Sequence, residues 1–302
     1  MSKYLQDRVA IVTGAGSGLG RAHALELARQ GARVVVNDIG GAHVGSAGRA
    51  VADEIVANGG SAMALPGDVT DYEAMQDMVA QVIEAWGRVD ILVNNAGILR
   101  DKSFAKMSLD DFRLVLDVHL MGSVHCTKAV WETMRAQRYG RIVMTTSSSG
   151  LYGNFGQANY GAAKMALVGL MQTLALEGER YGIRVNCLAP TAATAMTQGV
   201  LTEAALAHLA PAAVSPALVA LVGEDAPTRR ILLAGGGSVE SANITMTPGI
   251  YLGETTDAAT AVRARLPEIL DRAGECVPDT GFEQCQFELG KAGVEMMLPG
   301  NV

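Results

Sequence analysis

The sequence lacks the features that mark membrane, secreted and nucleic-acid-binding proteins. No stretch supplies about 18 uninterrupted apolar residues, and the first residues, MSKYLQDRVAIVTG, carry no apolar core behind a basic end. Lysine and arginine total 24 against 31 acidic residues, and the net charge of −7 disfavours a phosphate-backbone partner. We therefore expect a cytoplasmic protein that binds neither nucleic acid nor a membrane.

Cysteine is also scarce, and its spacing predicts no metal site. The four cysteines form no CxxC pair and have no histidine or cysteine at zinc-like spacing: Cys126, Cys187, Cys276 and Cys285. We expect their thiols to be reduced. The last residues, 299–302, lack a peroxisomal address of the Ser-Lys-Leu type, in keeping with a cytoplasmic location.

Apolar residues are plentiful, at 49% of the chain, and they alternate between two patterns. Short Val/Ile/Leu runs are separated by longer amphipathic stretches, which is typical of strands buried on both faces between helices. The strand runs are 9–12, 33–37, 61–65, 91–93, 141–145, 184–188 and 231–233, and the main helical stretches are 20–30, 47–58, 72–85, 108–137 and 157–181. This order predicts an α/β protein with a doubly wound parallel sheet, the Rossmann fold.

The strand pattern stops after Gly237, so we expect one Rossmann-fold domain over 1–237 and a C-terminal extension over 238–302 that serves as a lid, a tail or an interface arm. The stretch 161–176 is apolar on nearly every helical face, more than packing on one sheet requires. This favours a homo-oligomer, a dimer or a tetramer. Burial beneath the chain's own C-terminal segment is the alternative.

A glycine-rich turn follows the first strand run and leads into a helix. Its sequence is Thr-Gly-Ala-Gly-Ser-Gly-Leu-Gly, and the candidate cofactor-binding residues in it are Gly14, Ser17, Gly18, Leu19 and Gly20. Glycines let the backbone approach a pyrophosphate, whose charge the N–H groups of a helix N-terminus attract. The pattern indicates a dinucleotide site, and a plain packing turn is the alternative.

Asp38 ends the second strand run, eighteen residues beyond Gly20. An acid there can accept hydrogen bonds from both hydroxyls of an adenosine ribose and would repel a 2′-phosphate. Arginine and lysine are absent from the glycine turn and from 37–47. We therefore expect NAD rather than NADP. The alternative is that Asp38 only starts the following loop.

Two other turns at strand ends fit the same ligand. Asp68 and Val69 follow the third run and are candidates for holding the adenine amine, while Asn95, Ala96 and Gly97 bring small side chains to the crevice where the strand order reverses. Each alone would be an ordinary Asx or glycine turn.

Tyr160 and Lys164 are four residues apart on a predicted helix, so their side chains share one face, with Ser147 in the Ser-rich turn before it. A phenol titrates near pH 10, and bringing it near neutrality takes about three pKa units, or roughly 4 kcal/mol. An adjacent ammonium and an oxidised nicotinamide could supply that preference. The alternatives are a flexible serine turn and a solvated helix face.

Together these motifs, with Ser147 thirteen positions before Tyr160, resemble those of the short-chain dehydrogenase/reductase family over about residues 5–237. The resemblance implies hydride transfer between a nicotinamide and an alcohol or ketone carbon. Tyr160 would then be the general acid and base, Ser147 would hydrogen-bond the reacting oxygen, and Lys164 would bind the nicotinamide ribose and lower the tyrosine pKa.

Two positions depart from the family pattern. His119 stands where the family usually has an asparagine that completes the catalytic set; we expect a positional role, and a role titrating near pH 6.5 stays open. Pro190 is followed by Thr191 rather than glycine, and the next stretch looks one residue shorter, so Thr194 is the expected partner of the nicotinamide carboxamide.

Segments around Asp38, Ile98, His119, Tyr152 and Met196 resemble one branch of the family, the (3R)-hydroxyacyl-CoA dehydrogenase domains of peroxisomal multifunctional enzymes of type 2 and their stand-alone bacterial relatives. That branch shares the histidine. The resemblance implies NAD-dependent oxidation of a 3-hydroxyacyl-CoA or a hydroxysteroid. A 3-oxoacyl-[acyl-carrier-protein] reductase and a non-catalytic dinucleotide-binding protein are the alternatives.

Two residue sets could serve such a substrate. The first could line an apolar pocket or equally be ordinary core or interface: Met196, Val200, Leu201, Leu206, Leu209, Val214 and Leu218. The second could meet CoA phosphates, although solvated surface is the more common role of such residues: Arg100, Lys102 and Lys106.

Overall fold

The computed structural model describes residues 3–40, 46–193 and 202–295. The chain divides into two units, Met1–Ala242 and Asn243–Val302. Within the described ranges of the first unit, the strands are β1 (Val9–Val12), β2 (Arg33–Val36), β3 (Ser61–Ala64), β4 (Ile91–Asn94), β5 (Gly140–Thr145), β6 (Ile183–Pro190), β7 (Ile231–Gly235) and β8 (Ser238–Ala242).

The helices of the first unit lie between these strands. They are α1 (Gly18–Arg29), α2 (Ala47–Ala57), α3 (Tyr72–Trp86), α4 (Leu109–Leu116), α5 (Gly122–Gln137), α6 (Ser148–Tyr152), α7 (Ala158–Gly178), α8 (Glu203–His208) and α9 (Ser215–Val222). Short 3₁₀ turns are η1 (Phe104–Lys106), η3 (Glu179–Tyr181) and η4 (Pro211–Ala213), and a π-helical turn, η2 (Asp117–Met121), joins α4 to α5. None of the helices in the described ranges combines the length and apolar character that a membrane crossing requires.

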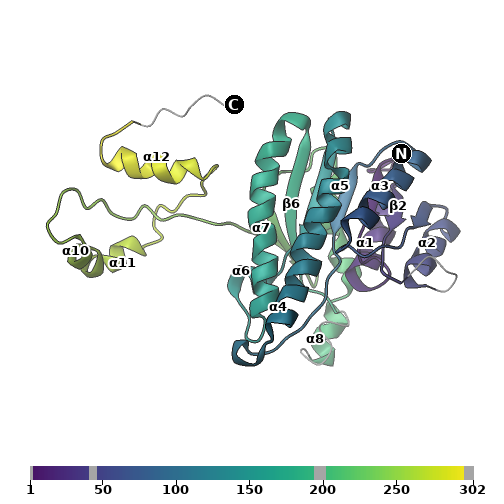
Figure 1. The fold of residues 1–302 in the computed structure, drawn as a ribbon, viewed down its shortest axis with the longest axis horizontal. Helices are drawn as coiled ribbons and strands as arrows, with labels where there is room; N and C mark the ends of the chain where they lie inside the picture. Colours follow the sequence, from purple (N-terminus) through teal and green to yellow (C-terminus); the bar gives the residue numbers. More distant parts are fainter. Residues whose placement is uncertain (1–2, 41–45, 194–201, 296–302) are drawn as a thin grey trace. The chain divides into compact units, whose positions relative to one another are not determined.

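The strands form one sheet in the order β3-β2-β1-β4-β5-β6-β7-β8, parallel except for the last pair. Figure 1 labels β2 and β6 of this sheet among the helices that flank it. The predicted doubly wound parallel sheet is therefore confirmed. The prediction that the strand pattern stops at Gly237 is wrong, because β8 follows at once and pairs antiparallel with β7. Its short sequence, SVESA, is largely exposed at the sheet edge and carries no apolar run that would reveal a buried strand.

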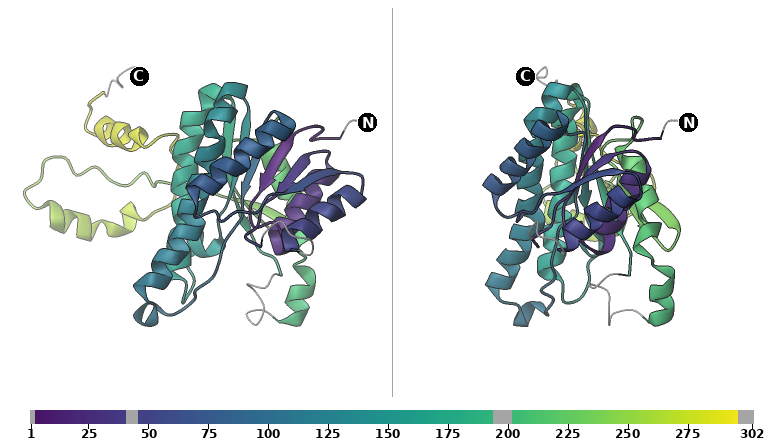
Figure 2. Two further views of the ribbon diagram at one scale, coloured as in Figure 1. Left: turned by 45° about the vertical axis from the view of Figure 1, so that its right-hand side comes forward. Right: turned by 90° about the vertical axis from the view of Figure 1, so that its right-hand side faces the viewer.

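Helices cover both faces of the sheet (Figure 2). The side chains of each strand point alternately to the two faces and so contribute to both hydrophobic cores. In β1, Ala10 and Val12 face the layer of α1, α2 and α9, whereas Val9 and Ile11 face the layer of α3, α5 and α7. Every residue of β1 and β4 is buried, as the continuous apolar runs predicted.

The strand order reverses between β1 and β4: β2 and β3 lie on the far side of β1, and β5 to β8 lie on the far side of β4. In open α/β sheets, the crevice at the carboxyl ends of the strands at such a point is where ligands bind. The glycine turn follows β1, and the loop that contains Asn95 follows β4, so the fold brings these two motifs together.

Helix α7 keeps part of its apolar surface exposed. Met165 is 38% exposed and Leu176 is 43% exposed. The homo-oligomer expected from this helix stays a prediction.

The second unit contains three short helices, α10 (Ala258–Ala264), α11 (Leu266–Ile269) and α12 (Phe282–Lys291), within its described residues. An antiparallel bridge joins Met246 to Cys276. The hydroxyl of Thr247 donates to the carbonyl of Ile269 at 2.8 Å.

Candidate active site

The turn between β1 and α1 has a backbone that only glycine adopts without strain. Gly14 and Gly18 have φ angles of +61° and +53°. A Cβ at Gly20 would lie 2.2 Å from the carbonyl oxygen of Gly14. The side chain of the N-cap residue Ser17 makes no capping hydrogen bond, and the first turn of α1 holds no acidic residue. This cradle fits the pyrophosphate of a dinucleotide.

Sequence reasoning missed Thr13, whose hydroxyl ties the two loops of the crevice together. Its Oγ1 accepts the N–H groups of Asn95 at 3.0 Å and Ala96 at 3.1 Å. The side-chain amide of Asn95 donates in turn to the carbonyl of Thr13 at 2.9 Å. Asn95 therefore braces the glycine turn with its side chain. Leu19 is half-buried and packs against the core.

Asp38 lies beside the glycine turn. Its Oδ2 accepts the N–H of Gly16 at 2.8 Å, and its Oδ1 accepts the N–H of Ile39 at 2.8 Å. The carboxylate is half-buried and fixed at the end of β2. It thus does more than start a loop, because it also holds the cradle.

The turn after β3 keeps the Asx geometry named above as the alternative. Asp68 is exposed, and its Oδ1 accepts the N–H and the hydroxyl of Thr70 at 2.9 and 2.8 Å. Val69 is 5% exposed, and its carbonyl accepts a hydrogen bond from Nδ1 of His125 at 3.0 Å. An Asx turn leaves the second carboxylate oxygen of Asp68 open to a ligand.

Ser147, Tyr160 and Lys164 meet where β5 ends. Ser147 is the N-cap of α6, and the other two lie on α7. The Lys164 Nζ lies 5.5 Å from the centre of the Tyr160 ring. It donates to the carbonyl of Thr145 at 2.5 Å and is 2% exposed. The two residues four apart do share one face of the helix.

That Lys164 and an oxidised nicotinamide together lower the pKa of Tyr160 stays a prediction, because the shift seen here comes from burial, Ser147 and Asp101. Burial raises the pKa of the Tyr160 phenol, and the nearby Asp101 carboxylate raises this pKa further. The hydrogen bond from the Ser147 hydroxyl to the Tyr160 oxygen lowers the pKa by a smaller amount than burial raises it. Burial also lowers the pKa of Lys164 to about 7. Desolvation disfavours both charged forms, and the ammonium is directed at the backbone of Thr145 rather than at the phenol.

Asp101 is a second residue that sequence reasoning missed. Its Oδ2 accepts a hydrogen bond from Nε2 of Gln157 at 2.6 Å, which joins the loop after β4 to the start of α7. Asn159 strengthens the junction by donating to the carbonyl of Arg100 at 3.1 Å. No motif marks Asp101, because its closeness to Tyr160 arises only when the two loops meet.

His119 lies in the π-helical turn η2 and is 2% exposed. Its Nε2 is 2.8 Å from the carbonyl oxygen and 3.1 Å from the nitrogen of Ile98. Its ring meets the Tyr160 ring edge-on, with centroids 5.2 Å apart. Burial, helped by the Lys164 ammonium, lowers the pKa of His119 to about 3. The ring is therefore neutral at neutral pH, and a role titrating near pH 6.5 is wrong.

The other predicted residues have mixed outcomes. Pro190 ends β6 beside β7, while Thr194 lies outside the described residues, as do Met196, Val200 and Leu201. Val214 and Leu218 are fully buried in the core beneath the sheet, so they do not line a pocket. Leu206 and Leu209 are half-buried, whereas Arg100, Lys102 and Lys106 are exposed.

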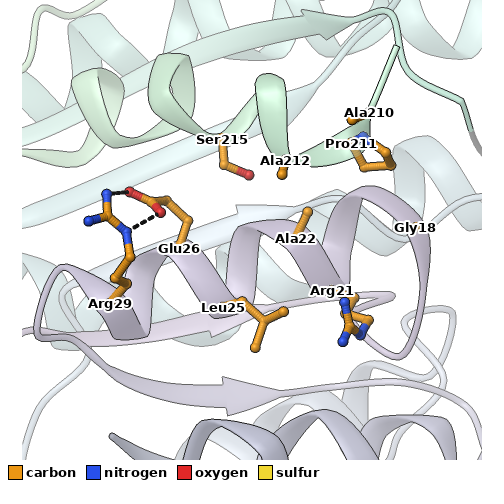
Figure 3. Close-up of a pocket in the computed structure, with 10 residues that line it drawn as sticks. All are labelled: Gly18, Arg21, Ala22, Leu25, Glu26, Arg29, Ala210, Pro211, Ala212 and Ser215. Atoms are coloured by element: carbon orange, nitrogen blue, oxygen red, sulfur yellow. Dashed lines mark hydrogen bonds and ion pairs between the residues drawn. The ribbon is translucent and has the colours of Figure 1, made fainter. Parts of the chain in front are cut away.

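A separate pocket of about 400 Å³ runs between α1 and the segment from Ala210 to Ser215 (Figure 3). Ala22, Leu25 and Pro211 give it an apolar wall, and an ion pair between Glu26 and Arg29 closes one end. None of Ser147, Tyr160 and Lys164 lines it.

Comparison with known proteins gives consistent matches. A family model described as short chain dehydrogenase matches residues 8–205. A short-chain type dehydrogenase/reductase of Mycobacterium tuberculosis is 47% identical over 276 residues, which cover 89% of this chain and 96% of that protein.

Two further proteins extend the comparison. Peroxisomal multifunctional enzyme type 2 of Drosophila melanogaster is 51% identical over 225 residues, 72% of this chain but 37% of that longer protein. Its full-length structure matches with a TM-score of 0.80 at 37% identity, over 96% of this chain and 50% of that chain. A 7α-hydroxysteroid dehydrogenase solved with NADH and 7-oxo glycochenodeoxycholic acid matches with a TM-score of 0.71 at 31% identity, over 78% of this chain and 96% of that one.

Proposed function

The chain belongs to the short-chain dehydrogenase family, an oxidoreductase family that binds a nicotinamide dinucleotide, and from that premise we propose that it is an NAD-dependent dehydrogenase of secondary alcohols. The observation that carries the proposal is the meeting of Ser147, Tyr160 and Lys164 at the sheet end that also holds the glycine cradle. Acid–base groups and a dinucleotide cradle in one crevice are what alcohol oxidation requires.

In this proposal Tyr160 exchanges the proton of the substrate oxygen. The phenolate takes the alcohol proton during oxidation, and the phenol so formed returns it during reduction, while the Ser147 hydroxyl orients the oxygen. A bound nicotinamide supplies or accepts the hydride. Lys164 binds the nicotinamide ribose, and its pKa near 7 lets the buried amine pass a proton on from the phenol.

NAD is the proposed dinucleotide because of Asp38. The carboxylate is held in place by the N–H of Gly16 at 2.8 Å, where it would accept hydrogen bonds from ribose hydroxyls and repel a 2′-phosphate. The proposed cofactor contacts further comprise Gly14, Ser17, Gly18, Leu19, Gly20, Asp68, Val69, Asn95, Ala96, Gly97, Pro190 and Thr194.

The proposed substrate is a (3R)-hydroxyacyl-CoA, with a hydroxysteroid as the second candidate. The first is supported by the resemblance of the segments around Asp38 and His119 to (3R)-hydroxyacyl-CoA dehydrogenase domains of peroxisomal multifunctional enzymes of type 2, and the Drosophila match is to a protein of that name, of which this chain spans 37%. The 7α-hydroxysteroid dehydrogenase supports the second at lower identity.

The test is a kinetic comparison of Tyr160→Phe with the parent protein. The purified chain is offered NAD or NADP with (3R)- and (3S)-hydroxyacyl-CoA, 3-oxoacyl-[acyl-carrier-protein], hydroxysteroids and simple alcohols. We expect NAD turnover with the (3R)-hydroxyacyl-CoA, and removal of the phenol hydroxyl should lower kcat about 10²–10⁴-fold, the usual contribution of a general acid–base.

Tyr152→Phe is the matched control. Tyr152 is another tyrosine of the same serine-rich region but is 69% exposed, so its hydroxyl is solvated and its loss should leave kcat within about twofold of the parent. Full activity in Tyr160→Phe would overturn the proposed chemistry. Preference for NADP would overturn the role of Asp38, and preference for a steroid would replace the first substrate by the second.

A further inference from the structure

The turn after β3 presents an unpaired donor beside an unpaired acceptor. Neither the N–H of Val69 nor Oδ2 of Asp68 has a hydrogen-bond partner among the residues that the structure describes. The other carboxylate oxygen, Oδ1, is already used by the N–H of Thr70 at 2.9 Å and by its hydroxyl at 2.8 Å. A carboxylate oxygen accepts and a peptide N–H donates, so this edge fits a ligand that carries one donor next to one acceptor.

Adenine carries this pair of groups on its Watson–Crick edge. Its N6 amine donates and the neighbouring ring nitrogen N1 accepts, whereas hypoxanthine has a carbonyl and an N–H in the same two places. In the proposed dinucleotide site, adenine would complete both hydrogen bonds, and hypoxanthine would set acceptor against acceptor and donor against donor. A comparison of the two bases therefore reports how well the turn is aimed.

A side chain from α5 fixes the backbone of this turn. Nδ1 of His125 lies 3.0 Å from the carbonyl oxygen of Val69, and because a carbonyl only accepts, Nδ1 is the donor. The imidazole is half-buried and packs against the ring of Tyr72 at the start of α3, with ring centroids 5.7 Å apart and planes inclined at 44°. This packing restricts the rotation of the imidazole.

The turn is also held by close packing and by a second side chain. A Cβ built on Gly122, at the start of α5, would lie 2.6 Å from Cγ2 and 3.0 Å from Cβ of Val69, so any larger residue there would displace the turn. From the end of β2, the side-chain amide of Asn37 donates to the carbonyls of Leu65 at 3.1 Å and Gly67 at 3.2 Å. The turn is therefore fixed from two separate elements, β2 and α5.

The hydrogen bond from His125 reaches the ligand-facing atoms through one peptide plane. The carbonyl of Val69 and the N–H of Thr70 belong to the same planar peptide group. His125 holds the oxygen of that group, and Oδ1 of Asp68 holds its N–H. Without the imidazole this peptide is free to rotate, so the Asp68 carboxylate bonded to it and the adjoining N–H of Val69 lose their fixed directions.

We propose that His125 is a positioning residue for the dinucleotide, which holds the peptide after Val69 so that Asp68 and the Val69 N–H face adenine. It acts through the backbone rather than by contact with the base. The proposal rests on the proposed function, since it takes the adenine of a nicotinamide dinucleotide to lie at this turn.

The first experiment is a calorimetric titration of the free protein with NAD and with nicotinamide hypoxanthine dinucleotide, followed by steady-state kinetics with both. His125→Ala should weaken NAD about tenfold and the hypoxanthine dinucleotide less than about threefold, because only adenine uses both fixed groups. The KM for NAD should rise by the same factor while kcat stays within about twofold, since the acid–base groups at the end of β5 are untouched.

Two other replacements separate the hydrogen bond from the ring packing. His125→Phe keeps a ring against Tyr72 but has no donor, so it should lose NAD affinity as His125→Ala does, with a melting temperature close to that of the parent. His125→Asn places an amide N–H near the position of Nδ1 and should bind NAD within about threefold of the parent. Lys128→Ala, at an exposed position of the same helix, is the matched control and should change neither titration by more than about twofold.

Parent-like NAD affinity in His125→Phe would overturn the proposal, because packing alone would then account for the histidine. Equal weakening of NAD and the hypoxanthine dinucleotide would also overturn it, since a general loss of stability does not distinguish the two bases. If His125→Ala does not fold, the contrast between His125→Phe and His125→Asn decides.

The second experiment tests whether His125 acts through Asp68. In Asp68→Asn the carboxylate is gone, so the preference for NAD over the hypoxanthine dinucleotide should already fall about tenfold, and adding His125→Ala should lower it by less than a further threefold. Two effects that multiply independently would refute the link. Failure of the proposed chemistry appears separately, as full activity in Tyr160→Phe, because the titrations measure binding without turnover.

Discussion

Replacing Asp38 by asparagine should change the choice of dinucleotide. The carboxylate accepts two backbone N–H groups, from Gly16 to Oδ2 and from Ile39 to Oδ1, both at 2.8 Å. An amide of the same shape keeps one acceptor oxygen and turns an N–H₂ group toward the other N–H. The variant therefore loses the negative charge and one charge-assisted acceptor without losing volume.

The magnitude follows from these two losses. Hydrogen bonds to charged groups contribute about 1.5–3 kcal/mol, and the half-buried position of Asp38 favours the lower figure, which corresponds to a loss of about tenfold in NAD affinity. A carboxylate and a phosphate about 4 Å apart repel by about 1 kcal/mol per unit charge in water-like surroundings, so removing the charge should improve NADP about tenfold. The ratio of kcat/KM for NAD over NADP should fall about 100-fold.

The assay is steady-state kinetics with both dinucleotides, supported by direct titration of each with the free protein. Asp68→Asn is the matched control, since Asp68 is expected at the adenine amine, which NAD and NADP share. It should weaken both dinucleotides equally and leave the ratio unchanged. The reasoning is refuted if Asp38→Asn keeps the parent ratio, or if Asp68→Asn changes the ratio as much.

Two pH experiments follow from the buried groups. Asp101→Asn removes a carboxylate that raises the pKa of Tyr160, so the phenolate becomes easier to form. In the plot of kcat/KM for oxidation against pH, the limb that reports Tyr160 should therefore move to lower pH. A limb that does not move would argue against an effect of Asp101 on Tyr160. Burial lowers the pKa of His23 to about 4 from an ordinary value of 6.5, so the neutral folded form contributes stability that is complete above pH 6.5 and is lost as the pH falls towards 4. By pH 5 the loss due to His23 is about 2 kcal/mol, and His119, whose pKa burial lowers to about 3, adds a loss of about the same size. Urea unfolding at pH 7 and 5 should therefore find a loss about 2 kcal/mol smaller in His23→Leu than in the parent, whereas equal losses in both would contradict the assignment.

Features that depend on neighbouring residues in the chain could be predicted from the sequence. The apolar runs at 9–12 and 91–93 are continuous because those strands are buried on both faces, and the structure places them at the centre of the sheet. The glycine turn and the four-residue spacing of Tyr160 and Lys164 were equally readable, because a positive φ and a shared helix face depend on neighbours in the chain.

Features that depend on distant parts of the chain were decided by the tertiary structure alone. Asp101 comes near Tyr160 only after two loops pack together, and the pKa of Tyr160 rises because the phenol is buried and this carboxylate lies near it. Gly97 is needed for close approach only because a helical turn from twenty-two residues later places the ring of His119 against it. A sequence pattern records periodicity and backbone preference, whereas desolvation and close approach depend on which surfaces meet in three dimensions.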